Sequence, residues 1–154
     1  MSRRAQIQMS VEQVAEFLEQ QRIVVCATNG ADGWPHLMPL WYVVRDGGLW
    51  AWTYAASQKV QNLERDPRAT LQIETGTEYN ELRGVMFKCE TRVHRAVEIV
   101  APTGLEIFTR YAGGVELPAE ARAMVEKQAQ KRVALEFVEQ GRASWDHRKL
   151  GGVY

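Results

Sequence analysis

The stretch TYAASQKVQNLERDP, residues 53–67, passes from strand-like to helical sequence within a few positions. An aromatic run, residues 49–54, is typical of a strand, and the spacing after it is helical. Ser57 stands where a helix N-cap is expected, and Asp66-Pro67 stands where the helix would end. Lys59 therefore lies in the first helical turn, beside free backbone N–H groups and the positive end of the helix dipole. Such a helix start suits an anionic phosphate group.

Two neighbours strengthen the interpretation of Lys59 as a ligand-binding residue. Ser57, Lys59 and Asn62 can face one side of the helix start, which would bring hydroxyl, ammonium and amide donors together. The alternative is a solvated lysine on a surface helix, and the sequence leaves that alternative open.

Length and composition favour one domain spanning residues 1–154. The 19 basic and 19 acidic residues balance, so no global field favours nucleic acid or an anionic membrane. No apolar run approaches the length of about 18 residues that a membrane span needs. Residues 1–9 carry no secretory signal and are expected to be flexible. Cys26 and Cys89 are expected to be buried, unpaired side chains, and we predict a cytoplasmic protein.

The order of the expected elements favours a mainly β protein, an antiparallel barrel with peripheral helices. Most expected strands are neighbours joined by short turns, which argues against a doubly wound parallel sheet. Neither a Gly-x-Gly-x-x-Gly loop nor a Walker motif is present. Six strands are expected at residues 23–28, 35–45, 49–54, 69–74, 85–97 and 133–138, with helices at 10–20, around 103–111 and at 118–130.

A second candidate element is the run HLMPLW, residues 36–41. Pro39 removes a ladder donor inside a strand, which is tolerated at a sheet edge or a bulge. A strand with free main-chain groups beside apolar and aromatic side chains can accommodate a flat heteroaromatic ring. An ordinary irregular strand that packs Leu37 and Leu40 into the core explains the pattern equally well.

The third candidate is the C-terminal tail, residues 144–154, which combines two aromatic side chains with several cationic or titratable ones. Although chain ends are often dispensable, this composition favours a tail that folds over a site in its own or a partner subunit. The three histidines share no metal-ligand spacing, so no metal site is expected. No nucleophilic-serine motif is present either.

The residues of the first stretch, with Asn62-Leu63 and Asp66-Pro67-Arg68, carry a family resemblance. The chain resembles the pyridoxamine 5′-phosphate oxidase-like split-barrel flavoproteins, and most of all their branch that uses the deazaflavin coenzyme F420. The resemblance implies a six-stranded antiparallel split barrel that forms a homodimer, with two cofactor sites at the interface. The implied cofactor-binding residues are Ser57, Lys59 and Asn62 at the phosphate, Met38, Pro39, Leu40 and Trp41 along the ring, Thr53 near the ribityl chain, and Trp145 and Lys149 of the tail from the partner subunit.

One position departs from the family pattern, because Gln58 occupies a place where many flavin-binding relatives have arginine. Loss of a bidentate donor weakens the case for a tightly held FMN phosphate. We therefore expect an F420H2-dependent reductase that transfers hydride to a conjugated small-molecule acceptor, with His36, Tyr42 or solvent as the proton source. The alternatives are an FMN-dependent oxidoreductase on the same fold and a non-catalytic protein that binds a flavin, haem or similar ligand.

Overall fold

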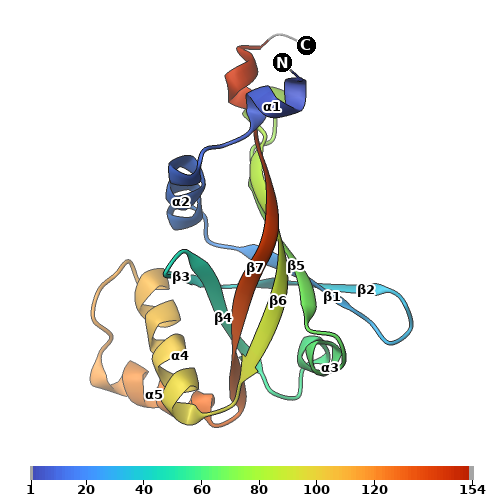
Figure 1. Ribbon diagram of the computed structural model, residues 1–154. Coiled ribbons are helices and arrows are strands. Elements are labelled where there is room, and N and C mark those ends of the chain that lie inside the picture. The colour runs from blue at the N-terminus through green and yellow to red at the C-terminus, as the bar shows by residue number, and fades with distance from the viewer. Residues whose placement is uncertain (1, 153–154) are drawn as a thin grey trace.

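The computed structural model describes residues 2–152, which form one seven-stranded antiparallel sheet with helices at its periphery (Figure 1). The mainly β, antiparallel prediction is therefore confirmed. The sheet has the order β2-β1-β5-β6-β7-β4-β3. The strands are β1 Val24–Asn29, β2 Pro35–Leu40, β3 Val43–Arg45, β4 Gly48–Tyr54, β5 Arg68–Thr75, β6 Arg83–His94 and β7 Arg132–Asp146.

The expected count of six strands is wrong because the single strand predicted at residues 35–45 is two strands. β2 lies at one edge of the sheet and β3 at the opposite edge, so the chain passes between the two edges at Trp41 and Tyr42. Tyr42 fixes this crossing point, since its side chain is fully buried and its hydroxyl donates to the carbonyl oxygen of Leu18 at 2.6 Å. Alternating hydrophobicity runs across the crossing point, and a period-two pattern alone cannot reveal a change of edge.

The helices are α1 Arg3–Ile7, α2 Val11–Gln20, α3 Gln58–Arg65, α4 Val97–Tyr111 and α5 Ala119–Ala129, with short 3-10 turns η1 Tyr79–Glu81 and η2 His147–Leu150. A capping box formed by Ser10 and Gln13 is present at the start of α2. α4 begins at Val97, where the end of a strand was expected, and contains Pro102. α1 lies within residues 1–9, where no element was predicted.

Two hydrophobic clusters lie on the two faces of the sheet. The larger one fills the barrel interior and includes both cysteines, which are free and buried as expected. The smaller one lies between β4 and the helix pair α4 and α5, around Trp52. Gly104 of α4 allows this close approach, because a Cβ atom there would lie 2.5 Å from the Trp52 ring.

β6 and β7 form a long ribbon that carries the C-terminal turn η2 to one end of the molecule, beside α1 (Figure 1). β7 continues through Gly141, and the register shifts beside it, where Gln140 of β7 is an extra residue between the partners of Lys88 and Cys89 of β6. None of the helices within residues 2–152 is both long and apolar enough to cross a bilayer.

Candidate functional site

The start of α3 has the geometry that the sequence predicts, with one informative difference. Ser57 is the N-cap residue with extended backbone angles, yet its side chain makes no capping hydrogen bond. The Ser57 Oγ atom is buried and has no hydrogen-bond partner among the described residues. A buried hydroxyl without a partner is costly, so such an atom usually marks a place for a water, an ion or a ligand.

The Lys59 side chain is turned into the protein. It is only 6% exposed, and its ammonium donates to Thr53 Oγ1 at 3.1 Å. No carboxylate of residues 2–152 forms an ion pair with it. Burial lowers the pKa of Lys59 from its ordinary value. The alternative of a solvated surface lysine is therefore wrong, and the buried charge lacks the counter-charge that such groups usually have.

Asn62 lies beneath the same helix turn and is fully buried. Its amide nitrogen donates to Thr28 Oγ1 at 3.0 Å, and its oxygen accepts from Gln58 at 2.9 Å. These bonds leave Asn62 one N–H for a ligand and make it chiefly a support that fixes α3 on β1. Thr28 was not identified from the sequence, although its alternation with Cys26 along β1 places it on the inward face.

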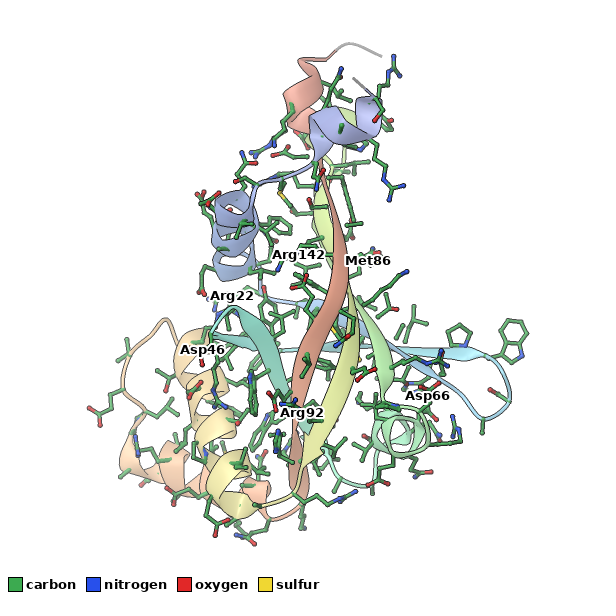
Figure 2. The ribbon with its side chains drawn as sticks, in the orientation of Figure 1. Arg22, Asp46, Asp66, Met86, Arg92 and Arg142 are labelled. Atoms are coloured by element: carbon green, nitrogen blue, oxygen red, sulfur yellow. The ribbon has the colours of Figure 1, made fainter. Side chains whose placement is uncertain are left out.

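The far end of α3 is anchored to the same strand. The Asp66 carboxylate, labelled in Figure 2, accepts from Asn29 Nδ2 at 2.8 Å and from the guanidinium of Arg68. Those hydrogen bonds hold the pKa of Asp66 well below its usual range. The second half of α3 is thus tied to β1, whereas its first turn is tied to β4 through Lys59 and Thr53.

β2 lies beside α3 at the edge of the sheet, so of the two positions that Pro39 allowed, an edge or a bulge, the structure shows the edge. His36 pairs with Thr28 and Met38 with Cys26 across the β1–β2 ladder, so all four side chains share one face. Cys26 also lies near enough to Lys59 to oppose, in part, the lowering of the Lys59 pKa by burial. The face of β2 that carries Met38 is therefore the face toward which α3 directs its lysine.

The other residues of the run 36–41, which was predicted to lie along the cofactor ring, are found in two different environments. Leu37 is 57% exposed, so the alternative that packs Leu37 into the core is wrong, whereas Leu40 packs against the core. Trp41 stacks on Tyr111 of α4, with ring centroids 4.2 Å apart. Trp41 thus lies against the helix pair.

A cavity of about 420 Å³ lies between the β1–β2 hairpin and α3. Trp34, His36, Gln58 and Asn62 are among its lining residues. The His36 Nδ1 atom is buried without a partner within the described residues, like Ser57 Oγ. Gln58 and Asn62 bring α3 to this cavity, whereas the unsatisfied Ser57 hydroxyl and the buried Lys59 ammonium belong to the same helix start but are not among the residues that line it.

Within one chain, the predicted tail residues Trp145 and Lys149 do not lie at the start of α3. Trp145 packs under Gly84, and Lys149 donates to the Gln8 carbonyl oxygen at 2.6 Å and to Gln13 Oε1 at 2.8 Å. Figure 1 shows this end of the β6–β7 ribbon far from α3. Closure of the site by the tail of the same subunit is therefore wrong. The last two residues of the predicted tail, 153 and 154, lie outside the described residues.

Comparisons with known proteins agree with this geometry. A family model described as pyridoxamine 5′-phosphate oxidase matches residues 10–143. The crystal structure of the conserved hypothetical protein Rv2991 from Mycobacterium tuberculosis is 40% identical, with a TM-score of 0.90 over 100% of this chain and 95% of that chain. A search of curated proteins finds no match.

Two more distant structures have the same fold. A protein named F420 reductase is 18% identical, with a TM-score of 0.64 over 83% of this chain and 94% of that one. The heme storage protein HutZ from Vibrio cholerae is 17% identical, with a TM-score of 0.66 over 88% and 96%. These likenesses confirm the split-barrel fold, here with seven strands.

Proposed function

The chain belongs to the pyridoxamine 5′-phosphate oxidase family, and from that premise we propose that it is an F420H2-dependent reductase. The proposed reaction transfers a hydride from reduced deazaflavin to a conjugated small-molecule acceptor. The observation that carries this proposal is the buried Lys59 ammonium, which has no carboxylate partner within residues 2–152, beside the unsatisfied Ser57 hydroxyl.

The start of α3 fits a cofactor phosphate in both charge and hydrogen bonding. Ser57 and Lys59 would hold the phosphate group together with the first backbone N–H groups of the helix. A phosphate would give the ammonium its missing counter-charge and the hydroxyl its missing partner. Asn62 would hold the helix turn in place and offer its remaining N–H.

F420 is favoured over FMN for two reasons. Gln58 supplies no guanidinium at the helix start, and its amide is already bonded to Asn62. This arrangement offers less charge than a doubly charged monoester phosphate calls for. The structural likeness to an F420 reductase adds support for the deazaflavin.

The exposed edge strand β2 would provide the wall for the cofactor ring. Met38, Pro39 and Leu40 would contact the ring through main-chain groups and apolar side chains, and Thr53 would lie near the ribityl chain. When bound, the deazaflavin supplies hydride from a ring carbon, so the protein binds, orients and excludes water. No side chain is required to act as an acid.

Tyr42 can be excluded as the proton donor. The Tyr42 hydroxyl is buried and donates to the Leu18 carbonyl oxygen, and burial raises the pKa of Tyr42 to about 12. His36 and solvent remain, and His36 has an unpartnered ring nitrogen at the cavity beside β2. We assign the proton supply to His36 or to water.

A second copy of the chain would complete the site. β2 exposes Leu37 and Met38 at a free sheet edge, which monomeric proteins usually cover. The tail of the same chain lies too far away to cover it (Figure 1). A homodimer in which Trp145 and Lys149 of the partner close the ring site is therefore part of the proposal.

Two titrations and one turnover assay test this function. Purified protein is titrated with F420 and separately with FMN by quenching of cofactor fluorescence, and oxidation of F420H2 is then followed with a panel of conjugated acceptors. We expect F420 to bind more tightly than FMN and at least one acceptor to be reduced. Tight FMN binding without an F420 response would support the FMN alternative, whereas binding of either cofactor without turnover would indicate a non-catalytic binding protein.

A further inference from the structure

Arg132, the first residue of β7, differs from the other arginines whose partners are known. Seven arginines form ion pairs with carboxylates, and three more donate to backbone carbonyl oxygens. Arg132 is partly buried, yet its side-chain hydrogen bonds go to neutral groups, Gln128 Oε1 at 3.0 Å and the Tyr54 side chain. No carboxylate within residues 2–152 pairs with it.

The guanidinium is nevertheless held in one position by aromatic rings. Its central carbon lies 4.4 Å from the centroid of the Trp52 ring and 4.0 Å from that of Tyr54. Trp52 is buried against α4, whereas Tyr54 is 54% exposed. These cation–π contacts, with the side-chain hydrogen bond to Tyr54, hold the guanidinium in place while its Nε has no partner among the described residues. The Arg132 side chain is therefore already ordered without a ligand, so binding would cost little further side-chain entropy.

One of the donors that bind carboxylates is unused. Nε is buried and has no partner among the described residues, whereas Nη2 donates to Gln128 and Tyr54 supplies a further side-chain hydrogen bond. Burial lowers the pKa of Arg132, and Tyr54 opposes that effect. A positive group with a free donor and no counter-charge has the electrostatics of an anion site.

The rest of the protein shows which anion such an arginine takes. Arg68 and Arg148 each bind a carboxylate side-on, with Nε donating at 2.9 Å and Nη2 at 2.7 Å. Arg132 offers the same pair of donors, with Nε free and Nη2 bonded to the amide oxygen of Gln128. Movement of the exposed Tyr54 side chain would open the edge to a ligand.

We propose that Arg132, stacked between Trp52 and Tyr54 at the junction of β4, β7 and α5, binds an oxyanion with two adjacent oxygens, a carboxylate or phosphate carried by a planar molecule. The two oxygens accept from the guanidinium, and the planar body lies against the exposed Tyr54 ring. This site is separate from the phosphate site proposed at the start of α3, because Tyr54 and Thr53, the partner of Lys59, project from opposite faces of β4.

Calorimetric titration of the whole protein tests the site with benzoate, with neutral benzamide of the same shape, and with inorganic phosphate. We expect benzoate to bind at least about tenfold more tightly than benzamide, since the charged group strengthens each hydrogen bond. Preference for phosphate over benzoate would identify a phosphate ester as the natural ligand, and the reverse a carboxylate. Binding of neither anion would overturn the proposal.

Variants assign the binding to Arg132. Arg132→Gln is expected to abolish benzoate binding, and Arg132→Lys, which keeps the charge but not the paired donors, to weaken it about tenfold. Arg92→Gln is the matched control, because Arg92 is an exposed arginine of β6 paired with Glu136 (labelled in Figure 2). Should Arg132→Gln fail to fold, Arg132→Lys decides alone. Unchanged benzoate affinity in a folded Arg132 variant would refute the site, whatever cofactor the protein binds.

Discussion

Replacement of Lys59 by Met is expected to stabilise the cofactor-free protein and to weaken cofactor binding, because it removes a buried charge. Met has nearly the same length and keeps the apolar contacts of the side chain. The lysine ammonium is almost completely buried and has one hydrogen bond, to Thr53, with no carboxylate partner among residues 2–152. The substitution therefore removes a charge that the cofactor-free protein stabilises poorly.

The magnitude follows from two opposing contributions. Burying an ammonium carries an effective desolvation penalty of several kcal/mol. A hydrogen bond from a charged group offsets about 1.5–3 kcal/mol of it. We expect Lys59→Met to raise the free energy of unfolding of the cofactor-free protein by roughly 1–2 kcal/mol, or the melting temperature by roughly 2–8 °C. Loss of the charged contact to phosphate should weaken cofactor binding by about ten- to a hundredfold.

Urea unfolding of the cofactor-free protein and fluorescence titration with F420 measure these two quantities. Lys88→Met is the control, because Lys88 is exposed on β6 and should change neither of them. A Lys59→Met protein that is less stable than the wild type, or that binds F420 equally well, would refute the assignment of Lys59 as an anion-binding residue.

Three further predictions concern the same region and its support. Because burial lowers the pKa of Lys59, cofactor affinity should fall as pH rises through that lowered pKa, whereas the cofactor-free protein should gain stability up to the ordinary lysine pKa, since the unfolded chain then binds more protons; Lys59→Met should abolish both trends in titration and urea unfolding. Ser57→Ala should weaken F420 binding about tenfold but cost less than about 0.5 kcal/mol of stability, because the hydroxyl makes no capping bond; a loss near 1 kcal/mol in urea unfolding would show that it caps the helix. Tyr42→Phe should lower the unfolding free energy by about 1–2 kcal/mol through loss of the bond to Leu18, with unchanged F420 affinity; lowered affinity would return Tyr42 to the site.

Local sequence signals predicted the bounds of α3 well. The change from strand to helix near Ser57 and the stop at Asp66-Pro67 depend on neighbouring residues, so the helix was found with nearly its observed bounds. The edge position of Pro39 also followed from a local rule about the missing N–H. The burial of Lys59, by contrast, depends on contacts with β1 and β4, and the sequence left it open.

Longer-range features were missed for a related reason. The crossing from β2 to β3 depends on Tyr42 reaching α2, which is far away in the sequence. The position of the tail depends on the length of the β6–β7 ribbon, which continues through Gly141 although glycine usually weakens a strand. The unsatisfied His36 nitrogen and the stacked Arg132 have no sequence signature, because both are defined by neighbours that only the fold supplies.

Comparison of a phosphorylated cofactor with its phosphate-free form tests the proposed phosphate-binding site at the start of α3 most directly. The protein is titrated, by fluorescence quenching at one pH and ionic strength, with F420 and with the deazaflavin riboflavin analogue that lacks the phosphate. If Ser57 and Lys59 grip the phosphate, F420 binds at least about tenfold more tightly, and Lys59→Met removes most of the difference. Equal affinity of the wild-type protein for the two molecules would contradict the proposed role of the α3 start.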